Sequence, residues 1–227
     1  MPVAPRASLT VGTTRLPLRR IHTLVVGSGA AGLNAAVQLH RHGVPDILIV
    51  TEGLDQGTSI NTGSDKQTYY KLGLYGTEPD APALMAESYV QAGSMHGDLA
   101  LVEAACSARC FLNLVNLGVP FPHDRYGQYV GYKTDHDPRQ RATSIGPYTS
   151  REMCHALIRE VHALRIPVLE QRRVVALVNV PDRDGFRAAG AIAVTASGRF
   201  EAFAADNVIY AVGGPGGLYK ALSLIHI

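Results

Sequence analysis

The 227-residue sequence has no tryptophan, only three cysteines and a formal net charge of only +2. Three cysteines cannot all pair within one chain, and their spacing is not that of a secreted disulfide framework, so we expect a reducing, cytoplasmic location. The small net charge, without a long run of one sign, gives no indication of nucleic acid or of acidic membranes as partners. No apolar stretch reaches membrane-spanning length without interruption, so no transmembrane segment is expected. What remains is a globular chain, 46% hydrophobic, that is long enough to bury a sizeable core.

A glycine-rich motif follows the first long apolar run. It lies between a predicted strand at 21–26 and a predicted helix at 30–42, and a second predicted strand at 46–50 completes a strand–helix–strand unit of about 30 residues. We interpret Gly27 as the tight turn, Gly29 as the approach to a pyrophosphate and Gly32 as the close helix–strand contact. A glycine-rich turn in some other α/β protein is the alternative. The predicted cofactor contacts of this motif are Gly27, Ser28, Gly29, Ala30, Ala31 and Gly32.

The residue that contacts the ribose is expected at the end of the second strand. Counting from Gly32 places Thr51 at this position and Glu52 one residue later. Because neighbouring strand residues point to opposite faces, one cannot simply replace the other. We favour a hydroxyl contact from Thr51, and a shifted register that brings Glu52 to the ribose is the alternative.

Three further segments have the composition of cofactor-binding loops or their supports. Small residues at 57–64 let backbone N–H groups and hydroxyls approach phosphates or ring oxygens, although a surface loop would have the same composition. The segment 117–121 ends a long predicted helix, and the segment 211–219 brings two glycine pairs to the carboxyl end of a strand predicted at 207–211. The predicted contacts are Thr58, Ser59, Thr62, Gly63, Ser64, Ala211, Gly213 and Gly214.

In this order, the four motifs resemble the N-terminal part of flavoproteins of the succinate dehydrogenase/fumarate reductase superfamily, over residues 24–220. The resemblance implies FAD and an α/β, Rossmann-like cofactor domain of the glutathione-reductase type, with a parallel sheet, a β-meander and an inserted, partial substrate-capping segment. It also implies that Val174 offers its backbone to the adenine. Thr58 stands where the membrane-bound dehydrogenases join a histidine to the flavin, so the resemblance implies FAD bound without a covalent bond.

The predicted organisation is an N-terminal extension at 1–20 and an FAD-binding domain at 21–221, with 66–148 as the inserted segment. The residues at 222–227 resemble the translation of a transposase mosaic-end adapter, and an ordinary apolar tail is the alternative. If they derive from an adapter, the natural protein continues past Ala221. The meander strands are predicted at 174–180, 188–195 and 200–204, and a third parallel strand at 167–169.

Two helices connect these elements. One begins with Asp98 as its N-cap, and a Thr149–Glu152 capping box begins the other. The first helix is expected to bury Leu99, Val102, Cys106, Cys110, Leu114 and Leu117 on one stripe. Cys106 and Cys110 also have the spacing of helical metal ligands, but on an apolar stripe we interpret them as core residues and predict no metal site.

The polar segment 132–143 is the predicted place of substrate contacts. Arg139 and Arg141 would hold a carboxylate by bidentate bonds, and His136 would orient the substrate or move a proton. A solvated loop whose charges pair with each other is the alternative, and no catalytic acid is identified within the sequence.

The sequence thus predicts an FAD-dependent oxidoreductase that transfers a hydride to or from a small, carboxylate-bearing substrate, with an unidentified electron donor or acceptor. The alternatives are a non-catalytic FAD-binding domain, an inert fragment, and an NAD-dependent dehydrogenase with the same first motif.

Overall fold

The computed structural model describes residues 7–63, 67–93, 95–134, 137–183 and 185–214. These residues form two compact units. Among the described residues, unit 1 comprises those at 7–62 and 157–214, and unit 2 comprises those at 63–156. Ser64, His136 and the predicted tail at 222–227 lie outside the described residues.

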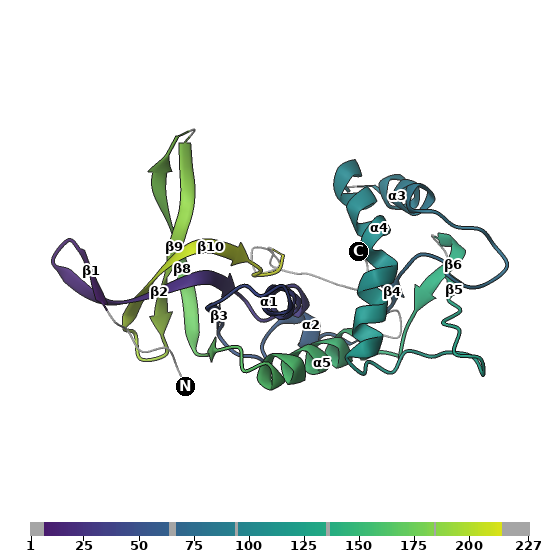
Figure 1. Ribbon diagram of the computed structural model, residues 1–227, viewed down its shortest axis with the longest axis horizontal. Coiled ribbons are helices and arrows are strands. Elements are labelled where there is room, and N and C mark those ends of the chain that lie inside the picture. Colours follow the sequence, from purple (N-terminus) through teal and green to yellow (C-terminus); the bar gives the residue numbers. More distant parts are fainter. Residues whose placement is uncertain (1–6, 64–66, 94, 135–136, 184, 215–227) are drawn as a thin grey trace. The chain divides into compact units, whose positions relative to one another are not determined.

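Unit 1 is built on a mixed sheet with strand order β7-β3-β2-β10-β9-β8, and β1 pairs with the first part of β2 (Figure 1). The central strands β7, β3, β2 and β10 are parallel, whereas β8, β9 and β10 form an antiparallel meander. This arrangement confirms the predicted α/β class and the third parallel strand. The strands are β1 (Ala7–Val11), β2 (Thr14–Val26), β3 (Ile47–Val50), β7 (Val168–Leu169), β8 (Arg172–Asp182), β9 (Gly185–Thr195) and β10 (Phe200–Tyr210).

Two strands of this sheet are longer than the sequence predicted. β2 begins at Thr14 rather than Ile21, so residues 14–20 belong to the sheet. β10 is continuous where two strands were expected: residues 200–204 pair with β9, and residues 202–210 pair with β2. Asp206 breaks the apolar pattern but is exposed, and neither glycine nor proline interrupts the strand. The last meander strand therefore continues directly into the parallel sheet and ends at Tyr210, shortly before the glycine pair 213–214.

The core of unit 1 lies on this sheet and under helix α1 (Ala30–Arg41). β3 is buried along its whole length, as is expected for a central parallel strand. α1 covers the sheet with Leu33, Ala36 and Val37, all of which are completely buried. A further cluster of buried residues joins the parallel strands to the meander and includes Ile21, Leu24, Val26, Leu48, Val50, Leu169 and Phe203.

Unit 2 contains two helices and a small antiparallel sheet of strand order β4-β6-β5. Helix α5 (Thr149–Ala163) begins in unit 2 and ends in unit 1. It buries Cys154, Leu157 and Val161. The other elements are β4 (Tyr69–Tyr70), α3 (Pro82–Gln91), α4 (Gly97–Asn116), β5 (Tyr132–Thr134) and β6 (Asp137–Thr143).

The stripe predicted for α4 is wrong. Leu99 and Val102 are 64% and 61% exposed, Cys110 is exposed and Cys106 is half-buried. Because α4 is apolar around most of its circumference, periodicity alone does not select the buried side. The N-cap is His96, and Asp98 lies in the first turn. The side chains that α4 does bury are Ala100, Ala104, Ser107, Phe111 and Leu114.

The capping box predicted for α5 is not formed. The Thr149 hydroxyl donates to the carbonyl of Gly146 (2.8 Å) and accepts from the N–H of Ile145 (3.1 Å). The N–H of Glu152 is already bonded to the carbonyl of Tyr148 (2.9 Å). Thr149 therefore closes the turn before the helix instead of capping its first N–H groups.

Lys71 is a fully buried lysine in unit 2. Its ammonium donates to the carbonyl of Tyr129 (2.9 Å) and lies 5.2 Å from the ring centroid of Phe111. Burial lowers the pKa of Lys71 from its ordinary value of 10.5. Since the unfolded chain binds this proton more tightly, Lys71 makes the free energy of unfolding rise with pH between its lowered pKa and 10.5.

We expect Lys71→Met to remove this rise. The urea concentration at the unfolding midpoint is measured for both proteins at about pH 7 and about pH 9.5. Between these two pH values the midpoint should increase more for the wild type than for Lys71→Met. The difference between the two proteins is informative because other groups act in the opposite direction in both. Burial raises the pKa of three such groups, so that their ionisation favours the unfolded chain at high pH: Tyr69, Tyr89 and Cys110. Equal gains in the two proteins would contradict the prediction.

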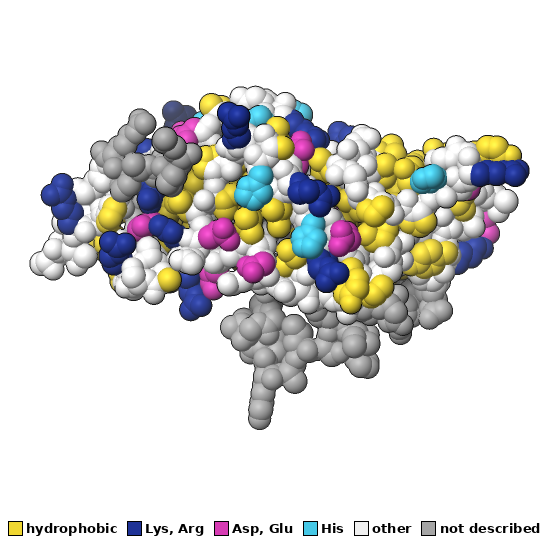
Figure 2. Space-filling view, turned by 90° about the horizontal axis from the view of Figure 1, so that it is seen from below, with side chains coloured by type: hydrophobic (Ala, Val, Ile, Leu, Met, Phe, Trp, Pro, Cys, Tyr) yellow, Lys and Arg dark blue, Asp and Glu magenta, His cyan; other side chains and the backbone are white. Residues whose placement is uncertain are grey.

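The surface shows no dominant charge on the face in Figure 2, where Lys and Arg side chains are interspersed with Asp, Glu and His. Among the described residues, no helix has the length and hydropathy that a membrane span requires. No cluster of three or more His, Cys, Asp or Glu side chains suited to a metal ion occurs in this part of the chain either.

Candidate cofactor site

A cavity of about 890 Å³ lies where β2, β3 and β10 end and α1 begins. All residues that line it belong to unit 1. The carboxyl ends of parallel strands are where sheets of this kind bind ligands. The lining consists of residues 26–31, 50–53 and 56–59 together with Arg172, Val174, Tyr210, Ala211, Val212 and Gly213.

The three glycines of the motif have different roles in this cavity. Gly27 has a φ of +103°, and a Cβ there would overlap the carbonyl oxygen of Ala211. A Cβ at Gly32 would overlap the carbonyl oxygen of Gly27 and lie 3.3 Å from the Cβ of Ala211. At Gly29 the nearest atom would be the Ser59 hydroxyl, 3.7 Å away. Gly27 and Gly32 therefore allow the backbone to pack, whereas Gly29 leaves open space beside the helix.

The amino end of α1 is suited to an anion. Gly29 is its N-cap in extended conformation, and no side chain caps the helix. The first N–H groups and the positive end of the helix dipole thus face the glycine-lined space. The loop at Gly57 approaches this end of the helix, since a Cβ on Gly57 would lie 3.7 Å from the Cα of Gly29. These residues fit a diphosphate group.

The structure turns the Thr51 hydroxyl inward. Its oxygen lies 2.7 Å from the hydroxyl oxygen of Ser28, which also donates to the carbonyl of Gly53 (3.0 Å). Thr51 and Ser28 are both buried, although both residues line the cavity. The carboxylate of Glu52, by contrast, is exposed and forms two hydrogen bonds with Arg173, at 2.8 and 3.2 Å. The ribose contact predicted for Thr51 would therefore compete with a buried hydrogen bond, whereas Glu52 has its carboxylate at the surface.

The end of β3 is tied to the start of β8. The N–H of Arg172 donates to the carbonyl of Thr51 and the N–H of Gln171 to that of Glu52, both at 3.0 Å. Gln171 has a φ of +58°, in the left-handed region. The Glu170 carboxylate accepts from the N–H of Leu54 (2.9 Å). Sequence reasoning missed Arg172 and Arg173 here, although two consecutive arginines at the start of the predicted meander were the available signal.

The remaining predicted cofactor residues are divided between the two units. Thr58, Ser59, Val174, Ala211 and Gly213 line the cavity. The Thr62 hydroxyl donates to the carbonyl of Thr58 (2.9 Å), at the end of the short helix α2 (Thr58–Asn61). Gly63 belongs to unit 2, and Gly214 is exposed and does not line the cavity.

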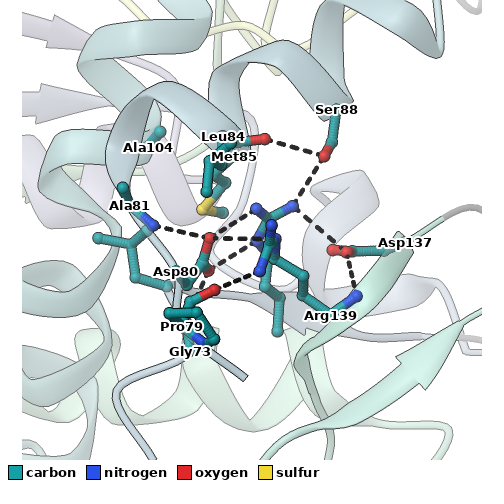
Figure 3. A network of polar contacts seen from close by, with 12 residues as sticks. Gly73, Pro79, Asp80, Ala81, Leu84, Met85, Ser88, Ala104, Asp137 and Arg139 are labelled. Atoms are coloured by element: carbon teal, nitrogen blue, oxygen red, sulfur yellow. Dashed lines mark hydrogen bonds and ion pairs between the residues drawn. The ribbon is translucent and has the colours of Figure 1, made fainter.

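Arg141 is not available to a substrate carboxylate. Its side chain is 1% exposed, and its guanidinium donates to both carboxylate oxygens of Asp80, at 2.8 and 2.7 Å. Figure 3 shows Asp80, Ser88 and Asp137 in this network of polar contacts. Ser88 and Asp137 accept two further hydrogen bonds at 2.9 and 3.2 Å. The predicted role of Arg141 is therefore corrected to that of a buried structural ion pair. Its neighbour Arg139 is partly exposed and donates to the carbonyl of Pro79, and a substrate contact from Arg139 stays a prediction.

A family model described as "FAD binding domain" matches residues 22–225. The chain belongs to this FAD-binding family. The match covers the glycine motif, the cavity and the end of β10 together, so FAD is the cofactor to which the cavity corresponds. A search of curated proteins finds no match to the chain.

Solved flavoproteins share the fold of this FAD-binding chain. Mycobacterium smegmatis Sdh1 in complex with UQ1 has a TM-score of 0.79 at 19% identity, covering 91% of this chain and 36% of Sdh1. The FrdA chain of E. coli quinol fumarate reductase has a TM-score of 0.75 at 17% identity, covering 89% of this chain and 34% of FrdA. The 3-ketosteroid-Δ4-(5α)-dehydrogenase of Rhodococcus jostii RHA1, in complex with 4-androstene-3,17-dione, has a TM-score of 0.67 at 21% identity. This match covers 86% of this chain and 46% of the dehydrogenase. The predicted resemblance is confirmed for the fold and for the FAD-binding family, and the chain spans about a third of the length of Sdh1 and FrdA.

Proposed function

We propose that this FAD-binding chain is the cofactor-binding part of an oxidoreductase that holds FAD without a covalent bond and exchanges a hydride with a small organic substrate. The observation that carries the proposal is the 890 Å³ cavity at the carboxyl ends of β2, β3 and β10, with the uncapped amino end of α1 on its wall. When bound, FAD supplies the hydride chemistry, at its flavin ring. The chain supplies binding and orientation.

The residues divide this work between them. The N–H groups at the start of α1 bind the diphosphate, and the backbone at Gly29 and Gly57 leaves room for it. The exposed Glu52 carboxylate lies where the ribose hydroxyls are expected. The hydrogen bond between Ser28 and Thr51 fixes the loop between these two parts of the site.

The names of two solved relatives support a substrate class. One is a fumarate reductase and the other a dehydrogenase bound to an unsaturated ketosteroid. Both names describe a carbon–carbon double bond close to a carbonyl carbon. We therefore propose hydride transfer across a carbon–carbon bond beside a carboxylate or a ketone, with a separate electron donor or acceptor.

The proposed domain organisation is an FAD-binding domain that includes the strand residues 14–20 and extends to residue 221, in which 66–148 is an insertion on the substrate side and after which 222–227 derive from an adapter. Unit 2, at 63–156, supports the insertion. A cytoplasmic location is also proposed, supported by a sequence with only three cysteines, whose spacing is not that of a secreted disulfide framework.

The test of this proposal is flavin retention. The chain is loaded with FAD and desalted, and we expect visible flavin absorbance in the protein fraction and release of intact FAD on acid precipitation. Flavin that remains with the precipitate would contradict non-covalent binding. Binding of NAD in preference to FAD would favour the dehydrogenase alternative, and retained flavin that no donor reduces would favour a non-catalytic domain.

Gly29→Asp is the matched variant for this test. Because a Cβ at Gly29 meets open space, the fold should be unchanged, but the new carboxylate stands beside the diphosphate. Like charges brought together cost several kcal/mol, so we expect FAD affinity to fall by about 100-fold or more. Gly29→Ala, which adds no charge, is the control, and an equal loss in both variants would contradict the electrostatic explanation.

A further inference from the structure

Charged side chains are scarce in the lining of the FAD cavity. Among the described residues that line it, only Glu52 and Arg172 carry a full charge at neutral pH. Glu52 is already paired with Arg173, which does not line this cavity. Arg172 is thus the cationic side chain among the described residues of the lining, and its charge faces no anionic group of the cavity wall except the paired Glu52.

The guanidinium of Arg172 is held in place by a backbone carbonyl and by an ion pair with the Glu201 carboxylate, which Arg19 shares. Its Nη1 donates to the carbonyl of Glu170 (2.7 Å), while its Nε and Nη2 lie 3.5 and 3.4 Å from the carboxylate oxygens of Glu201. Glu201 has a closer partner in the buried Arg19, at 2.8 Å. Two guanidinium groups therefore share one carboxylate, and the side chain of Arg172 is still 25% exposed. A group that is fixed in advance loses little entropy when it binds a ligand.

The strand pattern directs Arg172 toward the cavity. Residues two apart in a strand point to the same side, and both Arg172 and Val174 line the cavity. Arg173, between them, pairs with Glu52 instead. The backbone of Arg172 is bonded to the carbonyl of Thr51 at the end of β3, which is the ribose end of a dinucleotide site. The amino end of α1 is the proposed binding site of the diphosphate, so Arg172 is not needed for that group.

We propose that Arg172 is a specificity-determining residue of the cofactor site, whose planar guanidinium lies against the adenine ring of FAD. A guanidinium is planar and weakly hydrated, so it stacks in parallel on an aromatic ring, whereas the compact ammonium of a lysine is strongly hydrated and has no plane to stack. The proposal rests on the proposed function, because it deepens the way in which this cavity holds FAD.

The test uses ADP, which contains the adenosine and diphosphate but no flavin. Binding of ADP to the FAD-free chain is measured by calorimetry for the wild type, Arg172→Met, Arg172→Lys and the control Arg173→Met. We expect both Arg172 variants to lose about tenfold in affinity, with the salt dependence of binding unchanged, and Arg173→Met to stay within about twofold of the wild type.

Three results would overturn the assignment. Wild-type affinity in Arg172→Met shows that the side chain makes no contact. Retained affinity in Arg172→Lys, with a weaker salt dependence in Arg172→Met, shows that the contact is a charge on the diphosphate. An equal loss in Arg173→Met shows a general effect of charge at the start of β8.

Two further measurements keep the test decisive. Arg172→Met leaves Glu201 paired with Arg19, so it should fold, and its thermal midpoint checks this. In the wild type itself, ADP should bind more tightly than UDP, whose smaller ring covers less of the guanidinium. A wild-type chain that binds neither FAD nor ADP contradicts the proposed function. If the wild type binds both and Arg172→Met binds ADP as tightly as the wild type does, only the role of Arg172 is contradicted.

Discussion

Replacing Asp80 by alanine is expected to destabilise unit 2 by about 3–5 kcal/mol, the usual result of leaving one member of a buried ion pair alone. The Asp80 carboxylate accepts four hydrogen bonds, two from Arg141 and one each from the N–H groups of Gly73 (3.0 Å) and Ala81 (2.9 Å). Its removal leaves these donors without their acceptor in a site that is 1% exposed. Urea unfolding and limited proteolysis of unit 2 measure the effect.

Glu78 provides the control two residues away. It pairs with Lys133 at 2.6 Å, but both side chains are largely exposed, so Glu78→Ala should change stability little. The double variant Asp80→Ala/Arg141→Met removes both buried charges, and it should recover part of the stability that Asp80→Ala loses. Equal urea midpoints for Asp80→Ala and Glu78→Ala would refute the structural role of the pair.

The same pair makes unit 2 sensitive to acid. Burial by itself would raise the pKa of Asp80, but the hydrogen bonds from Arg141, Gly73 and Ala81 outweigh burial and hold this pKa below its ordinary value of 3.8. Stability from Asp80 is therefore complete above pH 3.8 and is lost as the pH falls through its lowered pKa in the folded protein.

The parts of the fold that follow from local patterns were predictable. The strand–helix–strand unit and the meander have a clear period, and the parallel sheet that contains them is implied by the glycine motif and the family resemblance. The buried side of α4 was not predictable, because apolar residues occur on most of its surface and only packing against the rest of unit 2 selects Phe111 over Val102. Asp206 likewise interrupts the apolar pattern and thus favours two separate strands, whereas β10 is one continuous strand.

The candidate site was predictable where backbone geometry decides and not where side-chain pairing decides. The positive φ of Gly27 and the crowded Cα of Gly32 follow from the motif itself. The inward Thr51 hydroxyl depends on Ser28, which is 23 residues earlier in the chain, and the burial of Arg141 depends on Asp80, which is 61 residues away. Such pairings are tertiary, and a sequence segment considered alone does not contain them.

Gly32→Ala is expected to destabilise unit 1 by about 3 kcal/mol and to abolish FAD retention. Gly32 lies inside α1, where intrinsic propensity alone favours alanine over glycine by about 1 kcal/mol. The structure predicts the opposite sign, because a Cβ would overlap the carbonyl oxygen of Gly27, a backbone atom that no rotamer change can move. Overpacking of this kind typically costs about 1–3 kcal/mol, and the displaced Gly27 turn lies on the cofactor cavity itself.

Gly29→Ala is the matched control, because the same methyl group at Gly29 meets only the Ser59 hydroxyl at 3.7 Å, and φ is −71° there. Thermal unfolding and flavin retention measured on the two variants separate packing from propensity. If helix propensity decides, Gly32→Ala unfolds at a higher temperature than the wild type and keeps its flavin. If the contact with Gly27 decides, Gly32→Ala loses both stability and flavin whereas Gly29→Ala keeps its thermal midpoint, since the close approach of α1 to β2 and β10 forms the floor of the site and Gly32 is what permits it.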